Sequence, residues 1–354
     1  MRLWIELEPR ADEKAVGAAL KGLGLWASVA RSAGGAVGFS VADHSRAVPV
    51  ERILELPGVA EVFERSSPHP RVDAQAGRSI VIGDLKLGGD EPPVLMAGPC
   101  SVESEAQIAE TAALVREAGG RLLRGGAFKP RTSPYAFDGH GREALEWMRR
   151  AAEQEGLLVI TEALGEGDVE LVADHTDVIQ VGTRNMQNFA LLRRIGATGK
   201  PVLLKRGMAA RIDEWLLAGE HLLEAGAAGV IFCERGVSGF DPSARNLLDL
   251  AAVAVLKEVQ RQPVVVDPSH ATGRRDIIPA LSRAALALGA DGLLLEVHGD
   301  ARLALSDGPQ ALDREDLGRV AADFRAALRE HAARRLQVEE ASDAPTARAA
   351  RANS

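Results

Sequence analysis

Eight short apolar runs recur between residues 94 and 298, and this repetition limits the fold more than any other feature of the chain. The runs are VLMAGPC (94–100), RLLRGGAF (121–128), LLVITEA (157–163), DVIQVG (177–182), PVLLKRG (201–207), GVIFCERG (229–236), PVVVDPSH (263–270) and GLLLEVH (292–298). A helix-length amphipathic segment separates each run from the next. Because strands that are buried on both faces read as continuous apolar runs, this α/β pattern predicts a closed (β/α)8 TIM barrel.

The first 70 residues follow a different pattern. Strand-like segments are expected at 2–8, 25–31, 36–42 and 59–65, and helical segments at 12–22 and 50–57. This βαββαβ order is typical of a small ferredoxin-like α+β domain. We further predict a linker and capping hairpin at 71–93, the barrel at 94–335 and a disordered tail at 336–354.

Composition excludes several classes of partner. The formal charge of the 354-residue chain is -8, so no general positive field exists to hold a nucleic acid. Two cysteines cannot build a disulfide framework, and the first residues lack the features of a signal peptide. No apolar stretch approaches the ~20 residues that span a bilayer. We therefore expect a soluble, cytoplasmic protein that acts on small molecules and contacts neither nucleic acid nor membrane.

Basic side chains follow several of the predicted strands. In a barrel of this type, the residues after the carboxyl ends of the strands surround one mouth. The cations at such positions are Arg124, Lys129, Arg131, Arg184, Lys205, Arg206 and Arg235. Unpaired buried cations are unfavourable, so their convergence predicts a phosphorylated carboxylic acid as ligand. The alternative for any one of them is a structural ion pair with Glu162, Glu234 or Asp267.

A second set of side chains offers metal ligands near the point where the barrel closes. It comprises Cys100, His270, Glu296 and Asp307. A thiolate, an imidazole and two carboxylates suit one borderline divalent ion such as Mn, Fe, Co or Zn. Taken singly, each of these residues has an ordinary structural explanation. Cys233 lies in the middle of a strand and is expected to be core packing. The absence of a glycine-rich nucleotide motif argues against ATP and NAD.

The motifs that carry these residues resemble a known family. They are AGPCSVES (97–104), RGGAFKPRTSPYAFDG (124–139), VITEALG (159–165), IQVGTRNMQNF (179–189), KPVLLKRG (200–207), CERG (233–236), DPSHATGRRD (267–276), LEVH (295–298) and ALSDG (304–308). Together they resemble the type I-beta 3-deoxy-7-phosphoheptulonate (DAHP) synthases, transferases that begin the shikimate pathway of aromatic amino acid biosynthesis. The resemblance implies a metal-dependent, aldol-like condensation of phosphoenolpyruvate with erythrose 4-phosphate.

The resemblance also implies a role for individual residues. The implied metal ligands are Cys100, His270, Glu296 and Asp307. The implied phosphoenolpyruvate site is Arg124, Lys129, Glu162, Arg184, Lys205 and Arg235, and the implied erythrose 4-phosphate site is Arg131, Thr132 and Ser133. Lys129, His270 and Cys100 would be catalytic, with Lys129 the first choice for delivering a proton to the aldehyde oxygen and with metal-bound water and His270 as its competitors.

Two other functions remain open at this point. One is 3-deoxy-manno-octulosonate 8-phosphate synthase, which uses arabinose 5-phosphate, although the segment KPRTS (129–133) favours the erythrose enzyme. The other is a catalytically silent sensor of aromatic amino acids, which the occupied ligand positions disfavour. In related enzymes a ferredoxin-like domain confers feedback inhibition, so we expect a homotetramer that tyrosine or phenylalanine inhibits. The alternative is a module for oligomerisation or solubility alone.

Overall fold

The computed structural model describes residues 3–31, 37–41, 45, 48–64, 67–128 and 138–343. Within these ranges the chain forms two compact units, Met1–Asp73 and Ala74–Ser354. Each unit has a core of its own.

The first unit is a four-stranded antiparallel sheet with two helices. Its elements are β1 (Leu3–Leu7), α1 (Glu13–Gly22), β2 (Ala27–Arg31), β3 (Val37–Val41), α2 (Val50–Leu54) and β4 (Val59–Glu64). The strands lie in the order β2-β3-β1-β4. Asp12 caps α1 by accepting from the backbone N–H groups of Lys14 and Ala15. The predicted βαββαβ order is confirmed, and its core includes the fully buried Ile5, Leu20 and Ile53.

A short helix and a hairpin precede the barrel. Helix α3 (Pro70–Gln75) occupies part of the stretch that we expected to be a linker. The strands β5 (Ile80–Ile82) and β6 (Leu85–Leu87) pair as an antiparallel hairpin. Ile80, Ile82 and Leu87 belong to the same apolar cluster as the side chains that fill the barrel. The hairpin thus packs against the amino-terminal ends of the barrel strands, opposite the end where chemistry takes place in such barrels.

The second unit confirms the predicted TIM barrel. Eight parallel strands close in the order β10-β11-β12-β13-β14-β7-β8-β9. Their bounds are β7 (Val94–Gly98), β8 (Leu122–Arg124), β9 (Leu158–Glu162), β10 (Val178–Val181), β11 (Pro201–Lys205), β12 (Gly229–Glu234), β13 (Val264–Val266) and β14 (Gly292–Glu296). Nearly every strand residue is buried, because the interior is filled with side chains and helices cover the outside.

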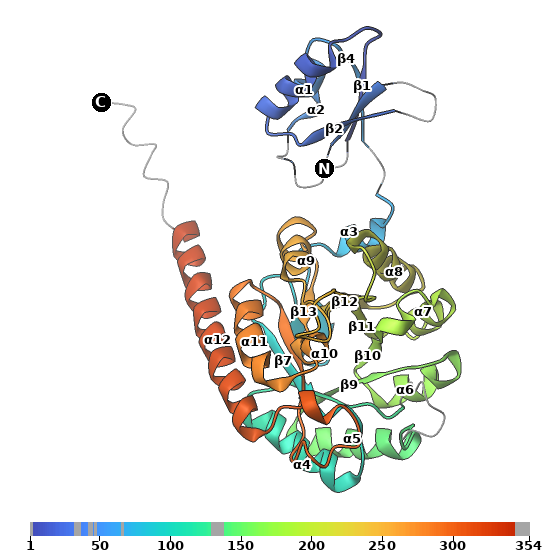
Figure 1. Ribbon diagram of the computed structural model, residues 1–354, viewed down its shortest axis with the longest axis vertical. Coiled ribbons are helices and arrows are strands. Elements are labelled where there is room, and N and C mark those ends of the chain that lie inside the picture. Colours follow the sequence, from blue (N-terminus) through green and yellow to red (C-terminus); the bar gives the residue numbers. More distant parts are fainter. Residues whose placement is uncertain are drawn as a thin grey trace. The chain divides into compact units, whose positions relative to one another are not determined.

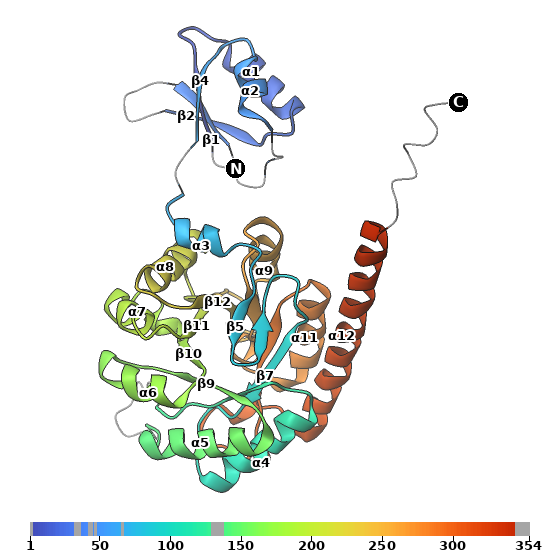
Figure 2. The same cartoon turned by 180° about the vertical axis from the view of Figure 1, so that it is seen from behind.

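The helices of this unit surround the strands, as the two opposite views show (Figures 1 and 2). They are α4 (Glu105–Glu117), α5 (Arg142–Glu155), α6 (Val169–His175), α7 (Phe189–Gly196), α8 (Ile212–Glu224), α9 (Leu250–Ala254), α10 (Pro268–Thr272), α11 (Ile278–Ala287) and α12 (Arg314–Asp343). Short helical turns are η1 (Glu166–Asp168), η2 (Thr183–Asn185), η3 (Val255–Val259), η4 (Arg275–Ile277) and η5 (Gly308–Gln310). Within the ranges described, no helix has both the length and the apolar character needed to cross a bilayer.

The carboxyl-terminal end differs from our expectation. Helix α12 continues to Asp343, so residues 336–343 are helical rather than part of a disordered tail. Ala, Arg and Glu are good helix formers, and an i,i+4 ion pair between Glu330 and Arg334 supports the turns just before this segment. Residues 344–354 lie outside the described ranges.

Candidate active site

A cavity of about 440 Å³ opens at the carboxyl ends of the strands. Among the residues described, five cations line it: Arg124, Arg184, Lys205, Arg235 and Arg245. The thiol of Cys100, the imidazole of His270 and the carboxylates of Glu162 and Asp307 line it as well. The barrel therefore brings together, in one place, side chains that are as far apart as residues 100 and 307 in the sequence.

The backbone around Gly98 places Cys100 at the cavity. Gly98 has a φ of 155°, and a Cβ at this position would lie 1.9 Å from the carbonyl oxygen of Arg124. Only glycine lets the end of β7 come so close to β8. Beyond it, the carbonyl of Cys100 accepts from the N–H of Gly126, which extends the pairing of the two strands. Cys100 is thereby held on a rigid element rather than on a free loop.

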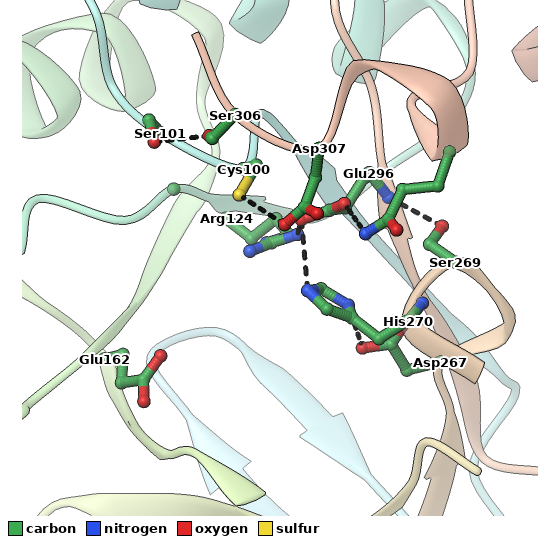
Figure 3. A network of polar contacts seen from close by, with 12 residues as sticks. Cys100, Ser101, Arg124, Glu162, Asp267, Ser269, His270, Glu296, Ser306 and Asp307 are labelled. Atoms are coloured by element: carbon green, nitrogen blue, oxygen red, sulfur yellow. Dashed lines mark hydrogen bonds and ion pairs between the residues drawn. The ribbon is translucent and has the colours of Figure 1, made fainter. Parts of the chain in front are cut away.

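Cys100, Glu296 and Asp307 form a group that can hold a metal ion. One potential ligand atom from each lies within 4.8 Å of the others. The Cys100 Sγ lies 3.2 Å from Oδ2 of Asp307 (Figure 3). Asp307 has a φ of 52°, a left-handed conformation that is uncommon for a residue other than glycine. Such conformations gather at functional sites, where the surrounding structure maintains them.

His270 lies beside this group on the short helix α10. Its Nε2 is 3.2 Å from Oε1 of Glu296, so its outer nitrogen faces the cluster (Figure 3). Asp267 is the N-cap of α10, and its Oδ1 accepts from the backbone N–H of His270. Proline at the next position favours a helix start, so the motif DPSH itself dictates where the imidazole lies.

Asp267 also orients the side chains on both sides of it. Its Oδ2 lies 2.7 Å from Nδ1 of His270 and 2.6 Å from Nζ of Lys205. Burial disfavours the ionised carboxyl group, but the charges of His270 and Lys205 outweigh burial and lower the pKa of Asp267 well below its usual range. A carboxylate that fixes the far nitrogen of a histidine is the usual support of an imidazole metal ligand.

Glu296 is contacted at both of its oxygens. Oε1 accepts from Nη1 of Arg124 at 2.7 Å, and Oε2 accepts from the amide of Gln310. The backbone N–H of Glu296 donates to Oγ of Ser269 at 3.0 Å. These contacts hold a fully buried carboxylate in one orientation.

The cations of the cavity differ in depth. Arg124, Lys205 and Arg235 are buried, whereas Arg184 and Arg245 are exposed at the rim. Arg235 donates through Nη2 to the carbonyl of His270, but its buried Nη1 has no hydrogen-bond partner among the residues described. Burial lowers the pKa of Arg235. A buried guanidinium nitrogen without a partner suits an anionic ligand in the cavity.

Arg206 does not belong to this set, contrary to our expectation. Its Nη1 lies 3.0 Å from Glu234 and 2.9 Å from Asp249, and its guanidinium packs over the ring of Trp215. Successive residues of a strand face opposite sides, so Lys205 points into the barrel and Arg206 points towards α8. Arg206 thus forms a structural ion pair with Glu234, which was the alternative to a place in the ligand site. Cys233 is fully buried, as expected for core packing, and burial raises the pKa of its thiol.

Sequence reasoning missed three features of the cavity. Arg245 lies in a long loop with no periodic pattern, and its Nη2 is 3.6 Å from Asp307. Gln310 gave no signal because amides are common in loops. Gly182 follows β10, where a Cβ would lie 1.9 Å from Oε1 of Glu162. The motif IQVG placed this glycine at a strand end but did not show what packs on it.

Four of the predicted residues lie outside the described ranges. They are Lys129, Arg131, Thr132 and Ser133. Glu162 does line the cavity and accepts from the Gln180 amide at 3.2 Å. Figure 3 shows its carboxylate apart from the cluster of Cys100, Glu296 and Asp307.

The barrel and its cavity define an α/β enzyme in which cations gather beside a cluster of side chains that could hold a metal ion. The chain belongs to the DAHP synthetase I family, whose model matches residues 69–329. It is 50% identical over 236 residues to a phospho-2-dehydro-3-deoxyheptonate aldolase of Thermotoga maritima, which covers 67% of this chain and 70% of that protein.

Solved structures and other relatives agree with this assignment. A crystal structure of phospho-2-dehydro-3-deoxyheptonate aldolase (DAHP synthase) from Thermotoga maritima matches with a TM-score of 0.72 and 38% identity, covering 92% of this chain and 96% of that one. More distant relatives include a 2-dehydro-3-deoxyphosphooctonate aldolase of Variovorax paradoxus, which is 35% identical over 64% of this chain and 87% of that protein.

Proposed function

We propose that this enzyme condenses phosphoenolpyruvate with erythrose 4-phosphate and water to give 3-deoxy-7-phosphoheptulonate and phosphate. The observation that carries the proposal is the convergence of buried cations and a thiol–carboxylate cluster on one cavity. The 50% identity to an aldolase of that name supports the same substrates. The two classes of side chain correspond to the two needs of the reaction, which are anion binding and activation of a carbonyl group.

The cations of the cavity are proposed to hold phosphoenolpyruvate. Arg124, Arg184, Lys205 and Arg235 would bind its carboxylate and phosphate, with Glu162 nearby. The unpartnered Nη1 of Arg235 offers a donor that needs no rearrangement. When C3 of the enol attacks the aldehyde carbon, positive character develops at C2, where water adds before phosphate leaves. Fixed cations then stabilise the negative charge that accumulates on the phosphate.

One divalent ion is proposed to be held by Cys100, His270, Glu296 and Asp307. The fit rests on the mixed sulfur, nitrogen and oxygen donors and on the short distances among them. When bound, such an ion acts as a Lewis acid that polarises the aldehyde carbonyl. Arg124 and Gln310 orient Glu296, and Asp267 orients His270. Lys129 remains the predicted proton donor, and Arg131, Thr132 and Ser133 the predicted site of the second phosphate.

A two-substrate assay tests this function. Purified enzyme loaded with Mn²⁺ or Zn²⁺ is given phosphoenolpyruvate with either erythrose 4-phosphate or arabinose 5-phosphate, and phosphate release is measured. We expect turnover with erythrose 4-phosphate. Turnover with arabinose 5-phosphate alone would instead assign the octulosonate activity that several more distant relatives carry by name. Turnover with neither aldehyde would contradict both assignments.

For the first unit we propose feedback inhibition by tyrosine or phenylalanine in a homotetrameric enzyme. The support is its βαββαβ order, which matches the pattern expected from the resemblance. Initial rates measured against increasing tyrosine and phenylalanine test the effector, and light scattering tests the tetramer. Flat rate curves for both amino acids would leave oligomerisation or solubility as the role of this unit.

A further inference from the structure

The loop that carries Asp307 needs support from outside itself. It runs from the end of β14 to η5, and several of its side chains are exposed, including those of Leu303 and Leu305. Asp307 nevertheless adopts a left-handed backbone conformation. A strained residue in an exposed loop keeps its conformation only when neighbouring groups hold the loop. The position of Asp307 relative to Cys100 therefore depends on contacts between this loop and the segment after β7.

Two hydrogen bonds join these segments just beside the two cluster residues. Oγ of Ser101 lies 2.6 Å from Oγ of Ser306, and both side chains are buried (Figure 3). The backbone N–H of Leu305 donates to Oε1 of Glu103 at 2.8 Å. Ser101 directly follows Cys100, and Ser306 directly precedes Asp307. Both hydrogen bonds are thus made by residues that lie within three positions of Cys100 or Asp307 in the sequence.

Glu103 also contacts the beginning of the same loop. Its Oε2 lies 3.5 Å from Nε2 of His298. The backbone N–H of Asp300 donates to Nδ1 of His298. The side chains of Glu103 and His298 are 12% and 10% exposed, so water competes little with this contact. The Glu103 carboxylate therefore accepts a hydrogen bond from the loop at Leu305 and lies close to it at His298, whose Nε2 makes no hydrogen bond among the described residues.

We propose that Glu103 is a positioning residue that fixes the Asp307 loop against the Cys100 segment and so preorganises the metal centre. Glu103 is not itself a ligand in this proposal, which rests on the proposed metal site. Loss of groups that orient ligands typically weakens metal binding by about 10–100-fold. The same tether should also slow opening of the loop.

The experiment compares E103A and E103Q with a matched control, E105Q. Glu105 is an exposed glutamate two residues away that pairs with Arg150 on the outside of the barrel. Metal-free proteins are titrated with Zn²⁺ by equilibrium dialysis, and hydrogen exchange is measured over residues 299–308. We expect E103A to weaken Zn²⁺ binding about 10–100-fold and to accelerate exchange. E103Q keeps the acceptor for Leu305 and should weaken binding less, whereas E105Q should match the wild type.

A dissociation constant of E103A within twofold of the wild type would overturn the proposal. If E103A does not fold, E103Q takes its place, and unchanged binding and exchange in that variant overturn the proposal equally. A wild-type protein that binds no metal would contradict the proposed metal centre instead. In that case accelerated exchange in E103A would still support the tether, so the two failures can be told apart.

Discussion

Replacing Asp267 with asparagine should destabilise the barrel through the buried charge that it leaves behind. The carboxylate is fully buried, and its Oδ2 lies 2.6 Å from Nζ of Lys205 and 2.7 Å from Nδ1 of His270. Removing one partner of a buried pair costs about 3–5 kcal/mol, because the remaining charge has no compensation. An amide keeps one acceptor oxygen, so we expect about 3 kcal/mol for Asp267→Asn, with weaker binding of phosphoenolpyruvate as well.

Urea unfolding followed by circular dichroism at pH 7 measures this effect. The control is Asp213→Asn, which breaks an exposed ion pair with Arg211 and should change stability much less. Equal stability of Asp267→Asn and the control would refute the assignment of a charged, buried Asp267.

The pH dependence gives a second check on the same variant. The folded protein lowers the pKa of Asp267, so the unfolded chain takes up a proton at higher pH than the folded one. The stabilising contribution of Asp267 is therefore complete above the ordinary aspartate pKa of about 3.9 and is lost as the pH falls below it. The stability difference between wild type and Asp267→Asn should accordingly shrink as the pH falls below about 3.9.

Further substitutions separate binding from structure. Arg235→Met should raise the KM for phosphoenolpyruvate roughly 10–100-fold in steady-state assays, because a charge-assisted hydrogen bond is lost. A KM unchanged by this substitution would exclude Arg235 from the site. Arg206→Met should instead lower stability by about 3 kcal/mol with KM unchanged, since it breaks a buried pair outside the cavity. If the Arg206→Met variant were as stable as the wild type and had a raised KM, Arg206 would instead belong to the substrate cavity. Gly182→Ala should displace the Glu162 carboxylate and lower kcat/KM about tenfold in the same assay. Unchanged kinetics would show that the position of the Glu162 carboxylate does not affect catalysis. Chelator treatment should abolish turnover until Mn²⁺ or Zn²⁺ is added back, and Cys100→Ala should resist this rescue.

Much of the architecture was predictable because its signals are local. A strand buried on both faces needs a continuous apolar run, and a cap such as Asp267 before Pro268 starts a helix wherever it occurs. Once eight runs are read as one barrel, the rule that chemistry lies at the carboxyl ends of the strands gathers Cys100, His270 and Glu296 at one mouth. These inferences need only periodicity and strand order.

Contacts that depend on the exact direction of a side chain were not predictable in this way. Side chains alternate along a strand, so the adjacent cations Lys205 and Arg206 must face opposite sides, but only the closed barrel decides that Lys205 faces the cavity and Arg206 pairs with Glu234. The contacts of Arg245 with Asp307 and of Glu103 with Leu305 involve loops, and no local sequence pattern predicts the path of a loop. The strands can be recognised from neighbouring residues along the chain. The ion pairs depend on distances between side chains from different strands and loops, and these distances are set only when the barrel closes.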